Sequence, residues 1–222
     1  MPTCGKLRQV LMYQSKNIII VGPSRSGKST LARLLNNEFN SFVISIDKLV
    51  AVFENAYPDL DIRLNWNRDK TTENIAPFLG NFLGVFSSPD GRSALGYSHG
   101  AVEDNNFILE GAYYDFDKID SIIRSYNIKD PNEQFIRIGL VQCNKTADEF
   151  YSDFRRYDTE NDWTYHLSDE ELRQVAEEAV SYNQEMMKDL TAHGFRVFDT
   201  SVDRDAIFSE IIETIRRDKE NS

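Results

Sequence analysis

Short apolar runs recur along the chain and alternate with longer segments in which apolar residues return every third or fourth position. Runs such as residues 17–21, which read NIIIV, have the length and content of strands buried on both faces. Segments such as 28–39 show the spacing of amphipathic helices. The predicted strands are 17–21, 41–45, 106–110, 134–141 and 195–198, and the predicted helices are 28–39, 47–56, 115–126, 146–157, 169–192 and 203–219. This alternation predicts an α/β fold with one five-stranded parallel sheet, right-handed crossovers and helices on both faces.

Local signals place several helix ends. Asp47 opens the second predicted helix in an N-cap-like position. Ser168 begins the capping box SDEE of the long helix, and Gly194 ends that helix as a C′ glycine. Residues 57–104 are irregular and rich in Asn, Gly, Pro and Ser, with an amphipathic patch near 75–86, so we expect a helical insertion there. A length of 222 residues suits one domain that carries such an insertion.

Charge and composition narrow the classes of partner. The 36 acidic and 25 basic residues give a net charge of −11. This balance argues against a nucleic-acid or anionic membrane partner, although it allows a small basic pocket. No apolar run approaches a membrane span, and the first residues do not read as a signal peptide. Cys4 and Cys143 match no zinc spacing and are expected to be reduced thiols, so we expect a cytoplasmic protein.

The strongest chemical signal lies between the first predicted strand and the first predicted helix. Residues 22–29 read GPSRSGKS and fit G-x-x-x-x-G-K-[ST], the Walker A motif or P-loop. Such a loop points backbone N–H groups at phosphate oxygens, and the following helix adds the partial positive charge of its N-terminus. Lys28 would reach the terminal phosphates of ATP, and Ser29 would supply a hydroxyl to Mg²⁺. The predicted nucleotide-binding residues of the loop are Gly22, Ser24, Arg25, Ser26, Gly27, Lys28, Ser29 and Thr30. The Arg25 side chain can either contact the nucleotide or face solvent.

Two classes of P-loop protein are disfavoured by the rest of the chain. A GTPase reads guanine with Asn-Lys-x-Asp, whereas residues 144–148 read NKTAD and place the acid one position too late. A GTPase also needs Asp-x-x-Gly at the third strand, where residues 109–111 read LEG. A motor ATPase needs an apolar strand that ends in Asp-Glu, and here the strand ends in a single Glu. Phosphoryl transfer to a small molecule is the remaining class.

The order of five motifs supports this remaining class. They read IIIVGPSRSGKST, VISIDKL, FILEGAYY, FRRYDTENDWTYHLSDEEL and FRVFDTS. In this order they resemble the adenylate-kinase-like family of P-loop kinases, which phosphorylate nucleoside monophosphates and other small molecules, and more narrowly a bacterial branch of that family. The resemblance covers most of the chain except about residues 57–104. It implies a three-layer α/β/α sandwich with ATP, Mg²⁺ and a small-molecule acceptor as ligands.

The resemblance also implies roles for residues that follow the strands. Asp47 would accept the proton of the acceptor hydroxyl or hold Mg²⁺ through water, or it only caps a helix. Glu110 would position the metal or bind an acceptor hydroxyl, or it is a solvated acid at a strand end. Thr200 and Ser201 would pass close to the adenine, or their loop only caps the last helix.

A lid is implied over about residues 155–168, since phosphoryl transfer in water risks hydrolysis. Arg155 or Arg156 would bring a guanidinium to the transferring phosphate. The other arginine would pair with Asp153 or Asp158, and both can instead form a solvated charge pair. Trp163 would pack the lid or anchor its loop.

The acceptor would bind over residues 57–104 in this fold. The polar and aromatic candidates there are Arg63, Arg68, Arg92, His99, Trp66 and Tyr97, and each can instead be a surface residue. The sequence therefore predicts an ATP- and Mg²⁺-dependent kinase whose acceptor it does not name. The rival interpretations are a nucleotide-hydrolysing switch or ATPase and a non-catalytic ATP-binding protein.

Overall fold

The structure, a computed structural model, describes residues 16–64, 67–87, 106–160 and 162–220. Five parallel strands form one sheet in the order β2-β3-β1-β4-β5. They are β1 (Asn17–Val21), β2 (Phe42–Ser45), β3 (Phe107–Gly111), β4 (Phe135–Val141) and β5 (Arg196–Asp199). β1 is central, and Ile19 lies opposite Leu109 of β3 and Arg137 of β4. Its last four residues are buried, so the prediction of a strand covered on both faces is confirmed.

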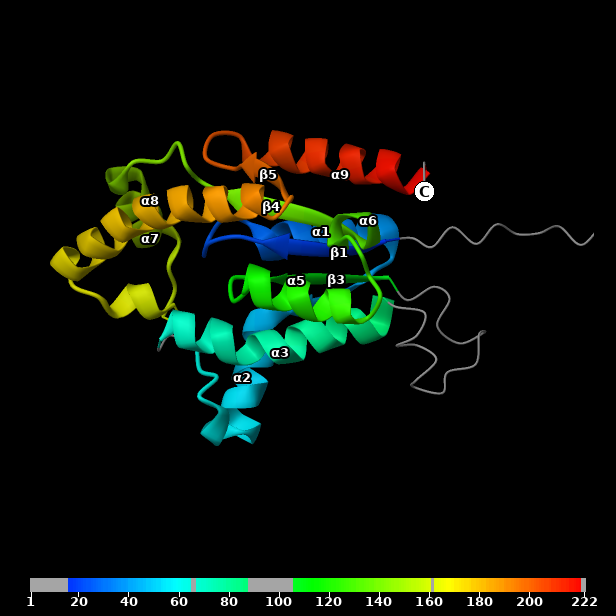
Figure 1. Ribbon diagram of the computed structural model, residues 1–222. Coiled ribbons are helices and arrows are strands. Elements are labelled where there is room, and N and C mark those ends of the chain that lie inside the picture. Colours follow the sequence, from blue (N-terminus) through cyan, green and yellow to red (C-terminus); the bar gives the residue numbers. More distant parts are fainter. Residues whose placement is uncertain (1–15, 65–66, 88–105, 161, 221–222) are drawn as a thin grey trace, which may run out of the picture.

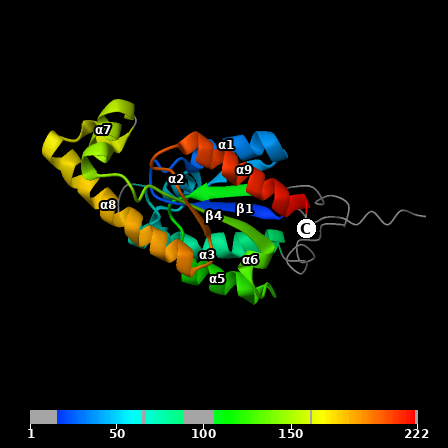
Figure 2. The ribbon, with the colours of Figure 1, turned by 90° about the horizontal axis from the view of Figure 1, so that it is seen from above.

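Helices cover both faces of the sheet, as the alternation predicted (Figures 1 and 2). On one face, α1 (Lys28–Phe39) and α9 (Arg204–Glu220) share an apolar cluster with Ile18 and Ile20. On the other face, α3 (Arg68–Ser87), α5 (Phe116–Ser125) and α8 (Asp169–Ala192) share a larger cluster with Ile19 and Val21. The remaining body elements are α2 (Ile46–Ala56), η1 (Pro58–Leu60) and the short α6 (Pro131–Gln134). The three-layer α/β/α sandwich is therefore confirmed.

The helix α3 is longer and more buried than the expected insertion. It has 20 residues, includes Pro77, and buries Ile75, Leu79 and Leu83 in the larger cluster. A Cβ atom on Gly84 would lie 2.2 Å from the ring of Tyr126, the C-cap residue of α5, so the glycine lets the two helices approach closely. α3 is thus one layer of the body, and its acceptor-binding role stays a prediction. Part of the expected insertion lies outside the described residues.

A helical arm projects beyond the carboxyl ends of the strands (Figure 2). It consists of α7 (Ala147–Tyr157), η2 (Trp163–His166) and the first turns of α8. Phe150 and Phe154 of α7 pack on Leu172 and Ala176 of α8 in a small apolar cluster of their own. Because this cluster is separate from the two clusters on the sheet, the arm has its own packing. It coincides with most of the segment expected to form a lid.

Several predicted helix ends are confirmed and one is wrong. Ser168 and Glu171 form the expected capping box, and Gly194 follows α8 with a φ of 74°. The N-cap of α2 is Ser45, and Asp47 lies in its first turn, so the cap assigned to Asp47 is wrong. Cys143 is a free thiol, and Cys4 lies outside the described residues. Within the described residues, no helix has both the length and the apolar character needed to cross a membrane.

Candidate functional site

The P-loop connects β1 to α1 and accepts hydrogen bonds from the segment after β5 and from the start of α9. Its turn uses positive φ angles at Arg25 (64°) and Gly27 (95°). Thr200 is 2 % exposed, and its hydroxyl donates to the Ser26 carbonyl at 3.0 Å. Arg204 donates to the Arg25 carbonyl at 3.2 Å. These contacts fix the carbonyl groups of Arg25 and Ser26 on the side of the loop that faces β5 and α9. The Thr200 hydroxyl thus supports the P-loop, and the role of the 199–201 loop beside the adenine stays a prediction.

Lys28 is a buried cation at the start of α1. The residue is only 6 % exposed, and its Nζ donates to the Pro23 carbonyl at 2.6 Å. Burial lowers the pKa of Lys28 to about 8, and Arg68 adds to this effect. The carboxylates of Asp47 and Glu110 act in the opposite direction. Lys28 therefore lies in a field shared with both predicted acids.

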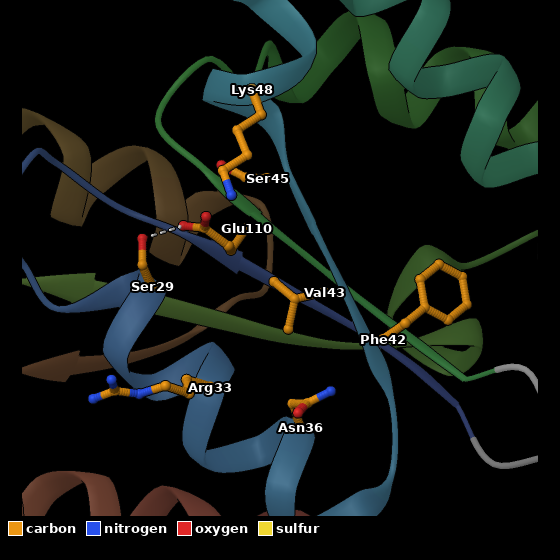
Figure 3. A pocket seen from close by; sticks show the side chains of 8 residues that line it. All are labelled: Ser29, Arg33, Asn36, Phe42, Val43, Ser45, Lys48 and Glu110. Carbon is orange, nitrogen blue, oxygen red and sulfur yellow. Dashed lines mark hydrogen bonds between the residues drawn. The ribbon is translucent and has the colours of Figure 1, made fainter.

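Glu110 and Ser29 meet at the carboxyl end of β3. The Ser29 hydroxyl donates to Glu110 Oε2 at 3.1 Å (Figure 3). Glu110 is 3 % exposed, so its alternative role as a solvated acid is wrong. The pair closes one end of a groove of about 450 Å³ between α1 and the edge strand β2, and Lys48 extends from α2 toward the same end (Figure 3). A hydroxyl beside a carboxylate is a donor set that suits Mg²⁺.

Asp47 of α2 and Arg68 of α3 lie near the carboxyl ends of β2 and β3. Asp47 is exposed, whereas Arg68 is half-buried with its guanidinium 3.9 Å from the ring centroid of Tyr182. Arg68 Nη2 donates to the Ala112 carbonyl, just after β3, at 3.1 Å. Burial lowers the pKa of Arg68, while Tyr113 and nearby carboxylates, including Asp47, oppose this shift. Arg68 is therefore the candidate from the expected acceptor segment whose charge acts on Lys28.

The other acceptor candidates lie elsewhere or outside the described residues. Arg63 pairs with Asp61 at 3.2 Å on the surface next to η1. Those outside the described residues are Trp66, Arg92, Tyr97 and His99. Arg68 alone among the named candidates therefore has a described place at the site.

The two arginines of the arm do not pair as the sequence suggested. Arg155 forms an ion pair with Asp169 at 2.6 Å and donates to the Leu167 carbonyl at 3.2 Å. Arg156 lies over the ring of Tyr157, 5.1 Å from its centroid. The expected partners are used by other cations: Asp153 pairs with Lys145, and Asp158 pairs with Arg25. The predicted pairing with Asp153 or Asp158 is therefore wrong.

Arg25, left open by the sequence, joins the P-loop to the arm. Its guanidinium pairs with Asp158 and, at 3.2 Å, with Asp162. It also lies 5.6 Å from the ring centroid of Phe154. The Thr159 N–H and hydroxyl lower the pKa of Asp162, and Arg25 contributes in the same direction. The three arm residues come from both sides of the turn after α7, so no local sequence pattern pointed to this contact.

A second hollow lies where α7 meets the segment after β5. It measures about 390 Å³ and is lined by Lys145, Asp148, Glu149, Ser152, Asp153 and Ser201. Asp199 accepts from the Ser201 N–H at 2.8 Å and from the Asn144 side chain at 3.0 Å. The cap of α9 is Asp203, which accepts from the Ala206 N–H at 2.9 Å. The alternative that the 199–201 loop caps the last helix is therefore wrong.

Comparison with known proteins identifies the fold. No protein-family model and no curated protein matches the chain. A gluconokinase from Sinorhizobium meliloti superposes with a TM-score of 0.53 at 14% identity, covering 94% of this chain and 95% of that one. A shikimate kinase from Bacteroides thetaiotaomicron gives 0.53 at 13% identity, covering 92% and 98%. The chain therefore has the fold of P-loop small-molecule kinases, as the resemblance implied.

Proposed function

We propose that this protein is an ATP- and Mg²⁺-dependent phosphotransferase that moves the γ-phosphoryl group of ATP to a small-molecule acceptor. The proposal rests above all on two cations and two carboxylates that lie beside the P-loop, close enough for the other three charges to influence Lys28. These residues are Lys28, Arg68, Asp47 and Glu110. They lie at the carboxyl ends of neighbouring parallel strands, where ligand sites of open α/β sheets form.

The donor half of the site would be built by the P-loop. Its N–H groups and the N-terminus of α1 would bind the β- and γ-phosphates. Lys28 would exchange the Pro23 carbonyl for a phosphate oxygen, since an anion relieves the desolvation that lowers its pKa. The hollow beside Ser201 and Lys145 supports a place for the nucleobase.

The metal would be held by Ser29 and Glu110 together with the phosphates. Mg²⁺ in nucleotide sites takes few protein oxygens and several from phosphate and water, so this adjacent hydroxyl and carboxylate fit it. When bound, the ion would neutralise charge on the transferring group. Asp47 is exposed and close enough to influence Lys28, so it is a further candidate for a water-mediated contact.

The acceptor half would be built by Asp47 and Arg68. The acceptor hydroxyl oxygen forms a bond to the γ-phosphorus while the bond to the bridging oxygen of ADP breaks, and Asp47 accepts the hydroxyl proton. Arg68 would bind a polar or anionic group of the acceptor. Arg155 or Arg156 would close from the arm onto the phosphoryl oxygens, for which Arg155 must release Asp169.

Binding and turnover test these roles separately. Wild-type protein is incubated with Mg·ATP and pools of metabolites, and ADP and phosphorylated products are measured by mass spectrometry. Lys28→Ala should abolish product formation. Asp47→Asn should lower kcat by about 100-fold or more with little change in the Kd of Mg·ATP. Asp59→Asn, at an exposed carboxylate of η1, is the matched control and should leave both unchanged. An equal loss of kcat and affinity in Asp47→Asn would make Asp47 structural, and ADP with free phosphate alone would indicate a hydrolase.

A further inference from the structure

Arg25 is a charged residue of the P-loop whose side chain pairs with carboxylates outside the loop. It belongs to the P-loop itself and has a φ of 64°, which side chains other than glycine rarely adopt. Its guanidinium is directed to two carboxylates of the arm, Asp158 and Asp162. The Asp158 side chain is only 3% exposed, so this carboxylate is largely removed from water next to the phosphate-binding loop.

The contact connects two units that have separate apolar clusters. The arm has its own apolar cluster, which includes Phe154, and Arg25 lies over the ring of that residue. Thr164 of η2 donates its hydroxyl to Asp158, so the acid is fixed to the arm. The Arg25 carbonyl is fixed in turn to Arg204 of α9. The ion pair therefore joins the arm to the body at the P-loop.

A phosphate in the P-loop would compete for this cation. A bound nucleotide would place its phosphates against the N–H groups of the loop that contains Arg25, and a guanidinium binds phosphate as well as carboxylate. The carboxylates of Asp158 and Asp162 would at the same time face the bound anion, which like-charge repulsion disfavours. Both effects oppose the present position of the arm when nucleotide is bound.

We propose that Arg25, Asp158 and Asp162 form a phosphate-sensitive latch that holds the arm to the P-loop and releases it when a nucleotide binds. The proposal rests on the proposed function, because it requires a nucleotide in the P-loop. Release frees Arg25 to contact the phosphates and lets the arm move with Arg155 and Arg156. The latch thus couples the position of the arm to occupancy of the donor site.

If the ion pair is a latch, substitutions on its two sides should change nucleotide affinity in opposite directions, which a purely structural contact would not do. Mg·ADP affinity is measured by calorimetry for wild type, Asp158→Asn and Arg25→Gln. Asp158→Asn keeps an oxygen for Thr164 but removes the competing charge, so it should bind Mg·ADP about fivefold or more tightly than wild type. Arg25→Gln removes the cation that the phosphate would gain, so it should bind more weakly. Asp162→Asn, at a more exposed carboxylate, should change affinity in the direction of Asp158→Asn and to a smaller extent.

Trp163 reports the arm directly, because it lies in η2 and is 51% exposed. In a Trp66→Phe background it is the single tryptophan, since the sequence has two. Mg·ADP should shift its emission in this background, and adding Asp158→Asn should give part of that shift without nucleotide. Arg216→Gln is the control, because Arg216 pairs with Glu38 and Glu213 on another surface, and it should change neither affinity nor emission.

Two outcomes overturn the proposal in different ways. Mg·ADP binding by wild type with unchanged affinity in both Asp158→Asn and Asp162→Asn, or weaker binding in both, would show that the pair only supports the fold. No binding of Mg·ADP or Mg·ATP by wild type would overturn the proposed function and the latch together. Loss of turnover alone would leave the latch measurements in place, since they need nucleotide binding only.

Discussion

Lys28 should titrate in an accessible pH range, and nucleotide affinity should follow its charge. Burial lowers its pKa to about 8. The ammonium is then about 0.9 charged at pH 7, about 0.5 at pH 8 and about 0.1 at pH 9. A bound phosphate supplies the anion that the buried ammonium lacks and raises its pKa. Nucleotide binding should therefore take up protons as the pH approaches and passes 8.

The size of the effect follows from these fractions. If only the charged form binds, the Kd of Mg·ADP should rise about tenfold between pH 7 and pH 9, or about 1.4 kcal/mol. A terminal phosphate with a pKa near 6 is already about nine-tenths ionised at pH 7, so its own ionisation changes the affinity little across this window. At pH 8 each bound nucleotide should take up about half a proton.

Calorimetry in two buffers of different ionisation enthalpy measures this uptake directly. Lys28→Arg is the control, because a guanidinium stays charged across the window and should give a flat profile if the variant still binds. A wild-type affinity that is constant from pH 7 to pH 9, with no buffer dependence of the binding enthalpy at pH 8, would refute the reasoning. Lys28 would then carry its full charge in the free protein.

Three further predictions concern stability and the metal. Lys28→Met should raise the free energy of unfolding at pH 7 by about 1–3 kcal/mol in urea titrations. The pKa of Lys28 is lower in the folded protein than the unfolded value of 10.5, so wild-type stability should rise with pH between about 8 and 10.5. The stability gained by Lys28→Met should shrink over the same pH range. Asp120→Ala should cost about 3–5 kcal/mol, because it leaves Arg137, 3% exposed and 3.0 Å from Asp120, buried without its counter-charge, and unchanged denaturant midpoints would refute this. Glu110→Ala should raise the Mg²⁺ concentration needed for half-maximal nucleotide binding severalfold, and an unchanged midpoint would exclude Glu110 from the metal site.

The sheet could be predicted because its signals are local. Each strand is a short apolar run, and the alternation with helices defines the crossovers. The capping box at Ser168 and the glycine at position 194 lie beside the ends that they mark. These features depend on neighbouring residues, so one sequence is enough to find them.

The helix α3 was harder to predict because its packing contradicts its local propensity. Pro77, Gly80 and Gly84 all lower the intrinsic helix signal. A Cβ at Gly80 would overlap Ile122 of α5, and a Cβ at Gly84 would overlap Tyr126, the C-cap residue of that helix. The residues that weaken the helix in isolation are those that allow its close packing in the fold.

The contacts around the P-loop could not be predicted, because they join distant parts of the chain. Thr200 donates to a carbonyl 174 positions earlier, and Arg25 pairs with acids of the arm. The motif placed Lys28 and Ser29, and the resemblance named Asp47 and Glu110. Arg68 appeared as one of several arginines, and only the tertiary structure brings it near Lys28.

The destination of the γ-phosphoryl group tests the central claim most directly. Protein, Mg²⁺ and ATP labelled at the γ-phosphate are incubated with metabolite pools, and the labelled products are separated. A phosphotransferase should place the label on an organic acceptor in amounts equal to the ADP formed, and Lys28→Ala should stop this transfer. Label found only in inorganic phosphate, or retained in ATP with every pool, would contradict the account.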